Sequence, residues 1–225
     1  MKATRRSVAV LIFGLLLAAG TALADDNQLS GLTAQWWQVI TSIPTTVNPL
    51  VDTTGADCMV GQRGPVWFLT GSLFGGTVTR NCTIPAGELL FFPVINNYQN
   101  NSPGICGQTG SLDVAQLRAN VAPFIDAATN LSVHLDGQAV NQLARVKSVV
   151  AFATTLPADN IFIAPCGGPA TSPPGVYSPS VDDGIYVLLP PLSLGAHTLH
   201  FHSESTGGFR LDVTYSLTIV PVVLK

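Results

Sequence analysis

Two histidines separated by one residue, His200 and His202, are the strongest candidates for chemistry in this sequence. They fall in a run that predicts a strand over residues 196–203, and residues two apart in a strand point to the same face. Both imidazoles can therefore reach one metal ion, and Glu204 continues the same row, whereas His197 has the opposite parity. One hypothesis is thus a divalent-metal cofactor at His200, His202 and Glu204 of a metal-dependent enzyme. The alternative is a pair of strand histidines without a ligand.

This segment also resembles a known metal motif. The spacing G-x4-H-x-H-x-E, from Gly195 to Glu204, is similar to the first metal motif of the cupin family. The glutamate follows the second histidine too closely for that motif. The companion motif departs further, because Pro85–Gly87 is followed by Leu90 and Phe91 where cupins place a histidine. The resemblance is therefore weak and incomplete.

A run of amide side chains directly follows a very apolar segment. The candidate ligand-binding residues are Asn96, Asn97, Tyr98, Gln99 and Asn100. Amides beside a tyrosine ring suit the hydroxyl edges and the apolar face of a sugar, which would make the protein a carbohydrate-binding module. The alternative is a long surface loop, closed by Pro103 and Cys106, because loops commonly collect Asn and Ser.

Other catalytic patterns are weak or missing. Asp182 and Asp183 offer oxygen ligands for calcium, but adjacent acids before a strand are more often solvated turn residues. Glu88 lies in an apolar stretch without a second carboxylate paired to it by sequence. The sequence contains no G-x-S-x-G motif, no phosphate-binding loop and no dinucleotide fingerprint. Because the sequence contains no recognisable combination of catalytic residues, it favours a non-catalytic protein.

The secondary structure that the sequence predicts around these candidate residues is mainly β-strand. Apolar residues recur at three- and four-residue steps over residues 28–43, which predicts an amphipathic helix ended by Pro44. A second helix is expected from Ser111 to about residue 128. Strand-like runs are found at 66–70, 77–83, 88–95, 131–135, 148–155, 184–189, 196–203 and 209–220. The last of these alternates most clearly, and Asp136–Gly137 suits a tight hairpin turn.

Four cysteines follow the N-terminal segment: Cys58, Cys82, Cys106 and Cys166. An even number without a C-x-x-C pair favours two disulfides in an exported chain. Of the three connectivities we expect 58–82 and 106–166. Cys58 and Cys82 flank one hairpin, and Cys106 and Cys166 both lie in Gly/Pro loops.

The N-terminus has the order of a secretory signal. Lys2, Arg5 and Arg6 precede an apolar run over residues 8–19, and Thr21–Ala24 supplies small residues before a cleavage point at Asp25. The apolar run is shorter than the roughly 20 residues that cross a bilayer. Both the general and the twin-arginine export routes fit this segment. We expect a periplasmic or extracellular protein without a membrane span after cleavage.

Composition agrees with export and limits the partners. Only 10% of the 225 residues are charged and 47% are hydrophobic, which excludes intrinsic disorder. Removing residues 1–24 takes away three basic residues and lowers the formal net charge from −3 to −6. No basic tract exists to hold a nucleic acid, so we expect carbohydrate or a cell-envelope protein as partner.

Two segments, Cys58–Leu69 and Cys82–Asn96, resemble a pattern found in uncharacterised exported bacterial proteins. Asp136–Gly137 and Gly195–His200 fit the same resemblance, which covers most of the chain after the signal segment. No activity is attached to that group. The resemblance implies secretion and a bacterial source, and it transfers no catalytic residue.

Together these patterns predict a mainly β protein. Residues 1–24 are expected to be a signal peptide, and residues 25–225 one β-sandwich domain of jelly-roll or immunoglobulin-like type with two minor helices. A closed barrel is the alternative. The expected function is a non-catalytic binding or structural module, with the metal-dependent enzyme and the carbohydrate-binding module as alternatives.

Overall fold

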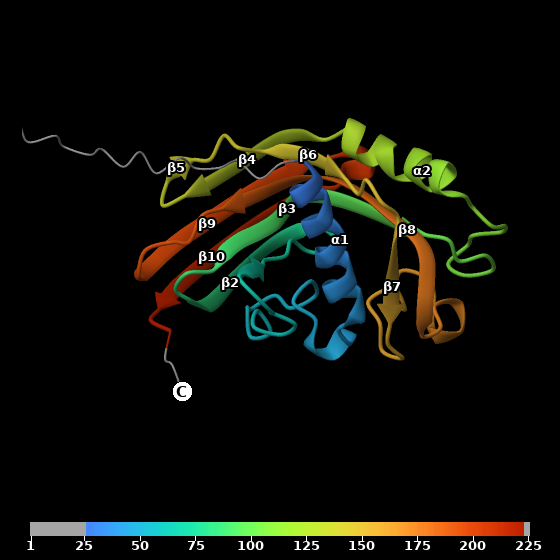
Figure 1. Ribbon diagram of the computed structural model, residues 1–225, viewed down its shortest axis with the longest axis horizontal. Helices are drawn as coiled ribbons and strands as arrows, with labels where there is room; N and C mark the ends of the chain where they lie inside the picture. The colour runs from blue at the N-terminus through green and yellow to red at the C-terminus, as the bar shows by residue number, and fades with distance from the viewer. Residues whose placement is uncertain (1–25, 223–225) are drawn as a thin grey trace, which may run out of the picture.

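The computed structural model describes residues 26–222, in which two five-stranded sheets and two α-helices make up the fold (Figure 1). The first sheet contains β1 (Val66–Phe68), β3 (Leu89–Asn100), β8 (Gly175–Leu189) and β6 (Ala144–Lys147), with β7 (Phe152–Leu156) also paired to β8. The second contains β2 (Gly76–Pro85), β10 (Arg210–Val220), β9 (Gly195–Glu204), β4 (Thr129–Leu135) and β5 (Gln138–Ala139). The mainly β fold with two helices is confirmed, and two facing mixed sheets are consistent with a sandwich. The predicted signal segment lies outside the described residues.

The two sheets bury a common core between them. Along β10, the side chains from Leu211 to Ile219 alternate between buried and more exposed positions, as the sequence predicted. Phe92 of β3 stacks on Phe201 of β9 with ring centroids 5.1 Å apart, which joins the two sheets. Each such fully buried apolar side chain contributes about 1.5–3 kcal/mol to folding.

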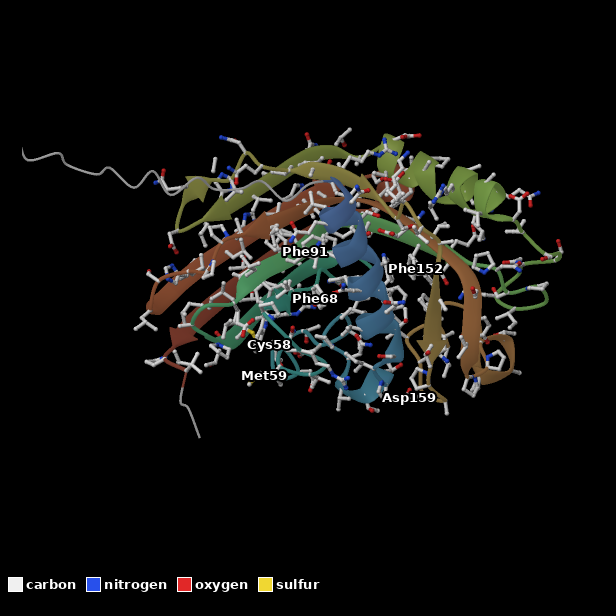
Figure 2. The ribbon with its side chains drawn as sticks, in the orientation of Figure 1. Cys58, Met59, Phe68, Phe91, Phe152 and Asp159 are labelled. Carbon is white, nitrogen blue, oxygen red and sulfur yellow. A yellow bond between two sulfur atoms is a disulfide. The ribbon has the colours of Figure 1, made fainter. Side chains whose placement is uncertain are left out.

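Helix α1 (Asp26–Ser42) covers the opposite face of the first sheet (Figure 1). Trp36 is fully buried, and its indole N–H donates to the carbonyl of Leu69 over 2.9 Å. Phe68 and Phe91, labelled in Figure 2, belong to the same apolar cluster. The predicted helix over 28–43, with Trp36 on its apolar face, is confirmed.

Helix α2 (Val114–Asp126) packs Leu117 and Val121 against Val181 of β8. It begins later than predicted, because Asp113 and not Ser111 is the N-cap. The Asp113 carboxylate accepts from the Gln116 backbone N–H, and the Gln116 side chain accepts from the Asp113 N–H. Within residues 26–222, no helix has the length and apolar character of a membrane-spanning segment.

Both predicted disulfides are confirmed. Cys58–Cys82 lies in the core between the sheets, and Cys106–Cys166 joins two loops that are 60 residues apart in sequence. Each link restricts the unfolded chain and stabilises the fold by typically about 2–4 kcal/mol. Two disulfides fit an oxidising, exported compartment.

Strand lengths were predicted less well. Strand β3 continues to Asn100, and β8 begins at Gly175 and not at residue 184, because residues 95–100 and 180–185 pair with each other. The strand expected at 148–155 is β7, which begins at Phe152, and β6 was not predicted. Pairing across the sheet stabilises polar residues that have weak strand propensity by themselves.

Candidate functional site

The predicted ligand-binding run, Asn96 to Asn100, is the last part of strand β3 and not a surface loop. Alternation along the strand places Asn96, Tyr98 and Asn100 on the α1 side of the sheet and Asn97 and Gln99 on the other. The Asn96 amide accordingly donates to the Tyr186 hydroxyl over 3.3 Å. The Asn97 amide donates to the Val121 carbonyl of α2 over 3.2 Å. The strand thus separates the five residues into two groups.

Tyr98 is the centre of an aromatic cluster. Its ring stacks on Trp37 at a centroid distance of 4.7 Å and on Phe162 at 5.9 Å. Its hydroxyl bonds to Thr154 and accepts from the Asn100 amide. Burial raises the pKa of the Tyr98 hydroxyl, so this group is neutral at physiological pH and acts as a hydrogen-bonding group.

Two cavities meet at Tyr98 and Phe162. The larger, of about 330 Å³, follows β3 from Pro93 to Tyr98. One wall consists of Trp37, Leu50 and Phe162, and the other of Phe124, Phe209 and Leu211. The smaller, of about 160 Å³, lies beyond Tyr98 and is bounded by the Cys106–Cys166 disulfide. We call the larger cavity the β3 groove; its volume falls in the range of small-ligand sites.

The β3 groove has the chemistry of a binding site. Among the described residues, no Asp, Glu, Lys, Arg or His side chain lines either cavity, and the cysteines of the smaller one are disulfide-bonded. All four histidines lie in β4 and β9 of the second sheet. The groove therefore offers apolar contact and hydrogen bonds.

Most of the amide side chains of the site already form hydrogen bonds within the protein. Besides donating to α2, the Asn97 side chain accepts the Tyr98 backbone N–H over 2.9 Å. The Asn96 and Asn100 amides each donate to a tyrosine hydroxyl. A carbohydrate site needs side-chain amides that are free to bind hydroxyls. The sugar-binding interpretation is weaker in the structure than in the sequence.

The predicted metal residues lie together on the outer face of the second sheet. His200 and His202 flank Asp212 of β10, with nitrogen–oxygen distances of 3.1 and 3.2 Å to its two carboxylate oxygens. The other ring nitrogen of His202 lies 3.2 Å from Glu204. The same-face prediction for these residues is therefore correct, and the imidazoles pair with carboxylates.

This cluster gives little support to a metal centre. His134 of β4 is opposite His200, but their ring centroids are 6.3 Å apart. Within residues 26–222, no group of three or more His, Cys, Asp or Glu side chains is placed to hold a metal ion. The divalent-metal site at His200, His202 and Glu204 stays a prediction that the geometry does not strengthen.

Asp182 and Asp183 are buried in β8, contrary to the expectation of solvated turn residues. Asp183 is held by a two-pronged contact with Arg145, at 2.8 and 3.0 Å. Asp182 accepts from the Tyr186 hydroxyl over 2.9 Å and from the Thr33 hydroxyl over 3.2 Å. Burial raises the pKa of Asp182 to about 6, against the lowering effect of these hydrogen bonds.

Comparison with known proteins adds no match: no family model, curated protein or solved structure is similar to this chain. The site therefore stands on its own geometry. Sequence reasoning identified Asn96–Asn100 but missed the walls of the groove. Trp37, Phe124, Phe162 and Phe209 come from four separate segments, and only the fold brings them together.

Proposed function

We propose that this chain is an exported, non-catalytic binding module whose ligand site is the β3 groove. The observation that carries the proposal is the groove itself: an uncharged, aromatic-walled cavity along β3 that is lined, among the described residues, by no Asp, Glu, Lys, Arg or His side chain. Two disulfides support an oxidising compartment, and the signal-like residues 1–24 support export to the periplasm or the cell exterior.

The β3 groove has a separate role from the rest of the core. Trp36, Phe91 and Phe201 are fully buried and explain packing. Phe124, Phe162 and Phe209 are only partly buried where they line the groove. Apolar rings gathered at the wall of a partly open cavity are typical of binding sites.

A blocking variant tests the proposal. Ser72 lines the groove, so Ser72→Trp introduces a large ring there. Ser216→Trp adds the same ring on the outer face of β10, where Ser216 is exposed, and is the matched control. The probes are an immobilised glycan array and a displayed library of random peptides, both presented to the oxidised protein.

We expect the wild-type protein and the Ser216→Trp variant to bind the same ligands, and the Ser72→Trp variant to lose them. Thermal melting of all three proteins checks that each is folded. Ligands that bind the Ser72→Trp variant as tightly as the wild type would contradict the assignment of the site. Absence of any ligand across both sets of probes would contradict the binding function.

A further inference from the structure

The free edge of β3 bears unpaired backbone groups along the floor of the β3 groove. Strand β1 pairs with β3 only at residues 89–91, and the last contact is from the Leu69 N–H to the Phe91 carbonyl over 3.0 Å. The chain then leaves the sheet, as the Thr70 hydroxyl bonds to the Pro49 carbonyl. From Pro93 to Tyr98, this edge of β3 faces the groove.

Hydrogen bonds around Asp182 show which backbone groups point into the groove. Asp182 is opposite Tyr98, but its N–H and C=O both bond to Ser148, away from β3. The Tyr98 N–H is likewise directed away from β8, to the Asn97 side chain. Tyr98 and Asp182 are therefore a non-hydrogen-bonded pair, and such pairs alternate along antiparallel strands.

By the same alternation, Asn96 and Gly184 are a second pair of this kind. The Asn96 N–H, the Asn96 C=O and the Tyr98 C=O therefore point toward the groove. Within residues 26–222, no residue outside the β3–β8 ladder bonds to these three groups. Pro93, which has no N–H to donate, fits the same edge, because proline in a sheet is confined to such positions.

We propose that an extended peptide segment of another protein binds this edge as an added strand; the proposal rests on the binding function proposed above. Its backbone would bond to Asn96 and Tyr98, which is the recognition mode of domains that bind peptides by strand addition. A segment along Pro93–Tyr98 would span about 17 Å. The free backbone groups favour a peptide over a sugar, because the side-chain amides of Asn96, Asn97 and Asn100 already donate within the protein.

The two walls of the β3 groove determine which side chains the bound peptide segment can carry. Side chains of an added strand alternate between the two walls. Both walls are apolar: Trp37, Leu50 and Phe162 on one side, and Phe124, Phe209 and Leu211 on the other. Because no charged residue of the described part of the chain lines the groove, a charge on the segment would be buried without a partner. The matching segment is uncharged and apolar on both faces. Phe74, which follows the groove residue Leu73 in the sequence, is 67% exposed.

Two matched substitutions at Asn96 test the backbone contact. Asn96→Pro removes the N–H that points into the groove, at a position where β8 does not use it. Asn96→Ala keeps the N–H and loses only the side chain. We expect affinity for peptides selected from the random library to be roughly tenfold or more lower in Asn96→Pro than in Asn96→Ala, which keeps the backbone N–H.

N-methylated peptides test the same contact without altering the protein. Methylation of alternate backbone nitrogens blocks strand pairing when those nitrogens face the protein and leaves it intact when they face away. We expect one of the two methylated sets to lose binding by roughly tenfold or more, and the other to keep it. This arm remains decisive even if the Asn96→Pro variant fails to fold.

Several outcomes would overturn the added strand. Equal binding of both methylated sets would do so, as would failure of the random library to yield any peptide blocked by Ser72→Trp. If the protein binds a glycan and Ser72→Trp removes that binding, the binding function is correct but the ligand is a sugar and not a peptide. Concentration-dependent dimerisation abolished by Asn96→Pro would identify a second copy of this chain as the occupant.

Discussion

Asp182 shows how the environment of one residue changes its chemistry. Its carboxyl group is almost completely buried in β8, bonded to Tyr186 and Thr33, and its pKa is raised to about 6. The ordinary pKa is 3.8. The folded protein therefore holds this proton more tightly than the unfolded chain does. Its stabilising effect is fully present below about pH 4 and is lost as the pH rises toward 6.

We expect Asp182→Asn to remove this pH dependence. Relative to the variant, the wild type should lose about 2 kcal/mol of stability between pH 4 and pH 6. Denaturant unfolding of both proteins across this range measures the difference, in which contributions of other carboxyl groups cancel. Parallel curves for the two proteins would show that Asp182 is not perturbed.

His197 offers a test at the surface. It lies 2.7 Å from Asp136, and the hydrogen bond to that carboxylate raises the pKa of the imidazole. We expect an NMR titration to place the His197 pKa above its usual range in the wild type, and Asp136→Asn to bring it down. His134, which does not bond to Asp136, is the internal control. An unchanged His197 titration in the variant would refute the pairing.

Two substitutions at Tyr98 separate the contribution of its ring to stability from that of its hydroxyl. Tyr98→Phe keeps the stacking on Trp37 and Phe162 and loses the bonds to Thr154 and Asn100. We expect it to cost about 1 kcal/mol in the free energy of unfolding, and Tyr98→Ala about 3–5 kcal/mol. Denaturant titration measures both, and equal losses would mean that the stacking contributes little.

At the scale of elements, the groove depends on a strand, a helix and a disulfide-linked pair of loops. Strand β3 provides the floor, α1 provides Trp37, and the segment before Cys166 provides Phe162. The Cys106–Cys166 link holds the loops that bound the smaller cavity. The Cys106 N–H also donates to the Thr171 carbonyl, so a covalent link and a backbone hydrogen bond both constrain that end of the site.

We expect the double variant Cys106→Ser/Cys166→Ser to lose about 2–4 kcal/mol of stability. Hydrogen exchange should accelerate in residues 101–110 and 160–172 while the β9 and β10 amides stay protected. Cys58→Ser/Cys82→Ser is the comparison, because that link lies between the sheets. Uniform acceleration across the whole chain in the first variant would contradict a local role for the link.

At the scale of the whole molecule, local patterns predicted much of the fold. The alternation of β10 and the apolar stripe of α1 each reflect interactions that a short segment reveals, and the disulfides follow from the even number and the loop positions of the four cysteines. The burial of Asp182 and Asp183 was not predictable in this way. It depends on Arg145, Thr33 and Ser148, which come from distant parts of the chain.

The candidate site, too, was predictable from local sequence patterns only in part. The amide run Asn96–Asn100 was visible in the sequence, but its secondary structure was predicted as a loop because its pairing with Ser180–Gly184 is a long-range contact. The free strand edge is a property of topology, since it exists only because β1 stops at Phe68. Neither the strand structure of residues 96–100 nor the free edge of β3 can be recognised from a short stretch of the sequence.

We expect this molecule to bind its ligand in the β3 groove and not at the histidine face of the second sheet. Protein-observed NMR of the oxidised wild type with a library of small uncharged fragments tests it directly. We predict chemical-shift changes concentrated at Trp37, Asn96, Tyr98, Phe124 and Phe209. Changes concentrated at His200, His202 and Asp212, or scattered evenly over the surface, would contradict the account.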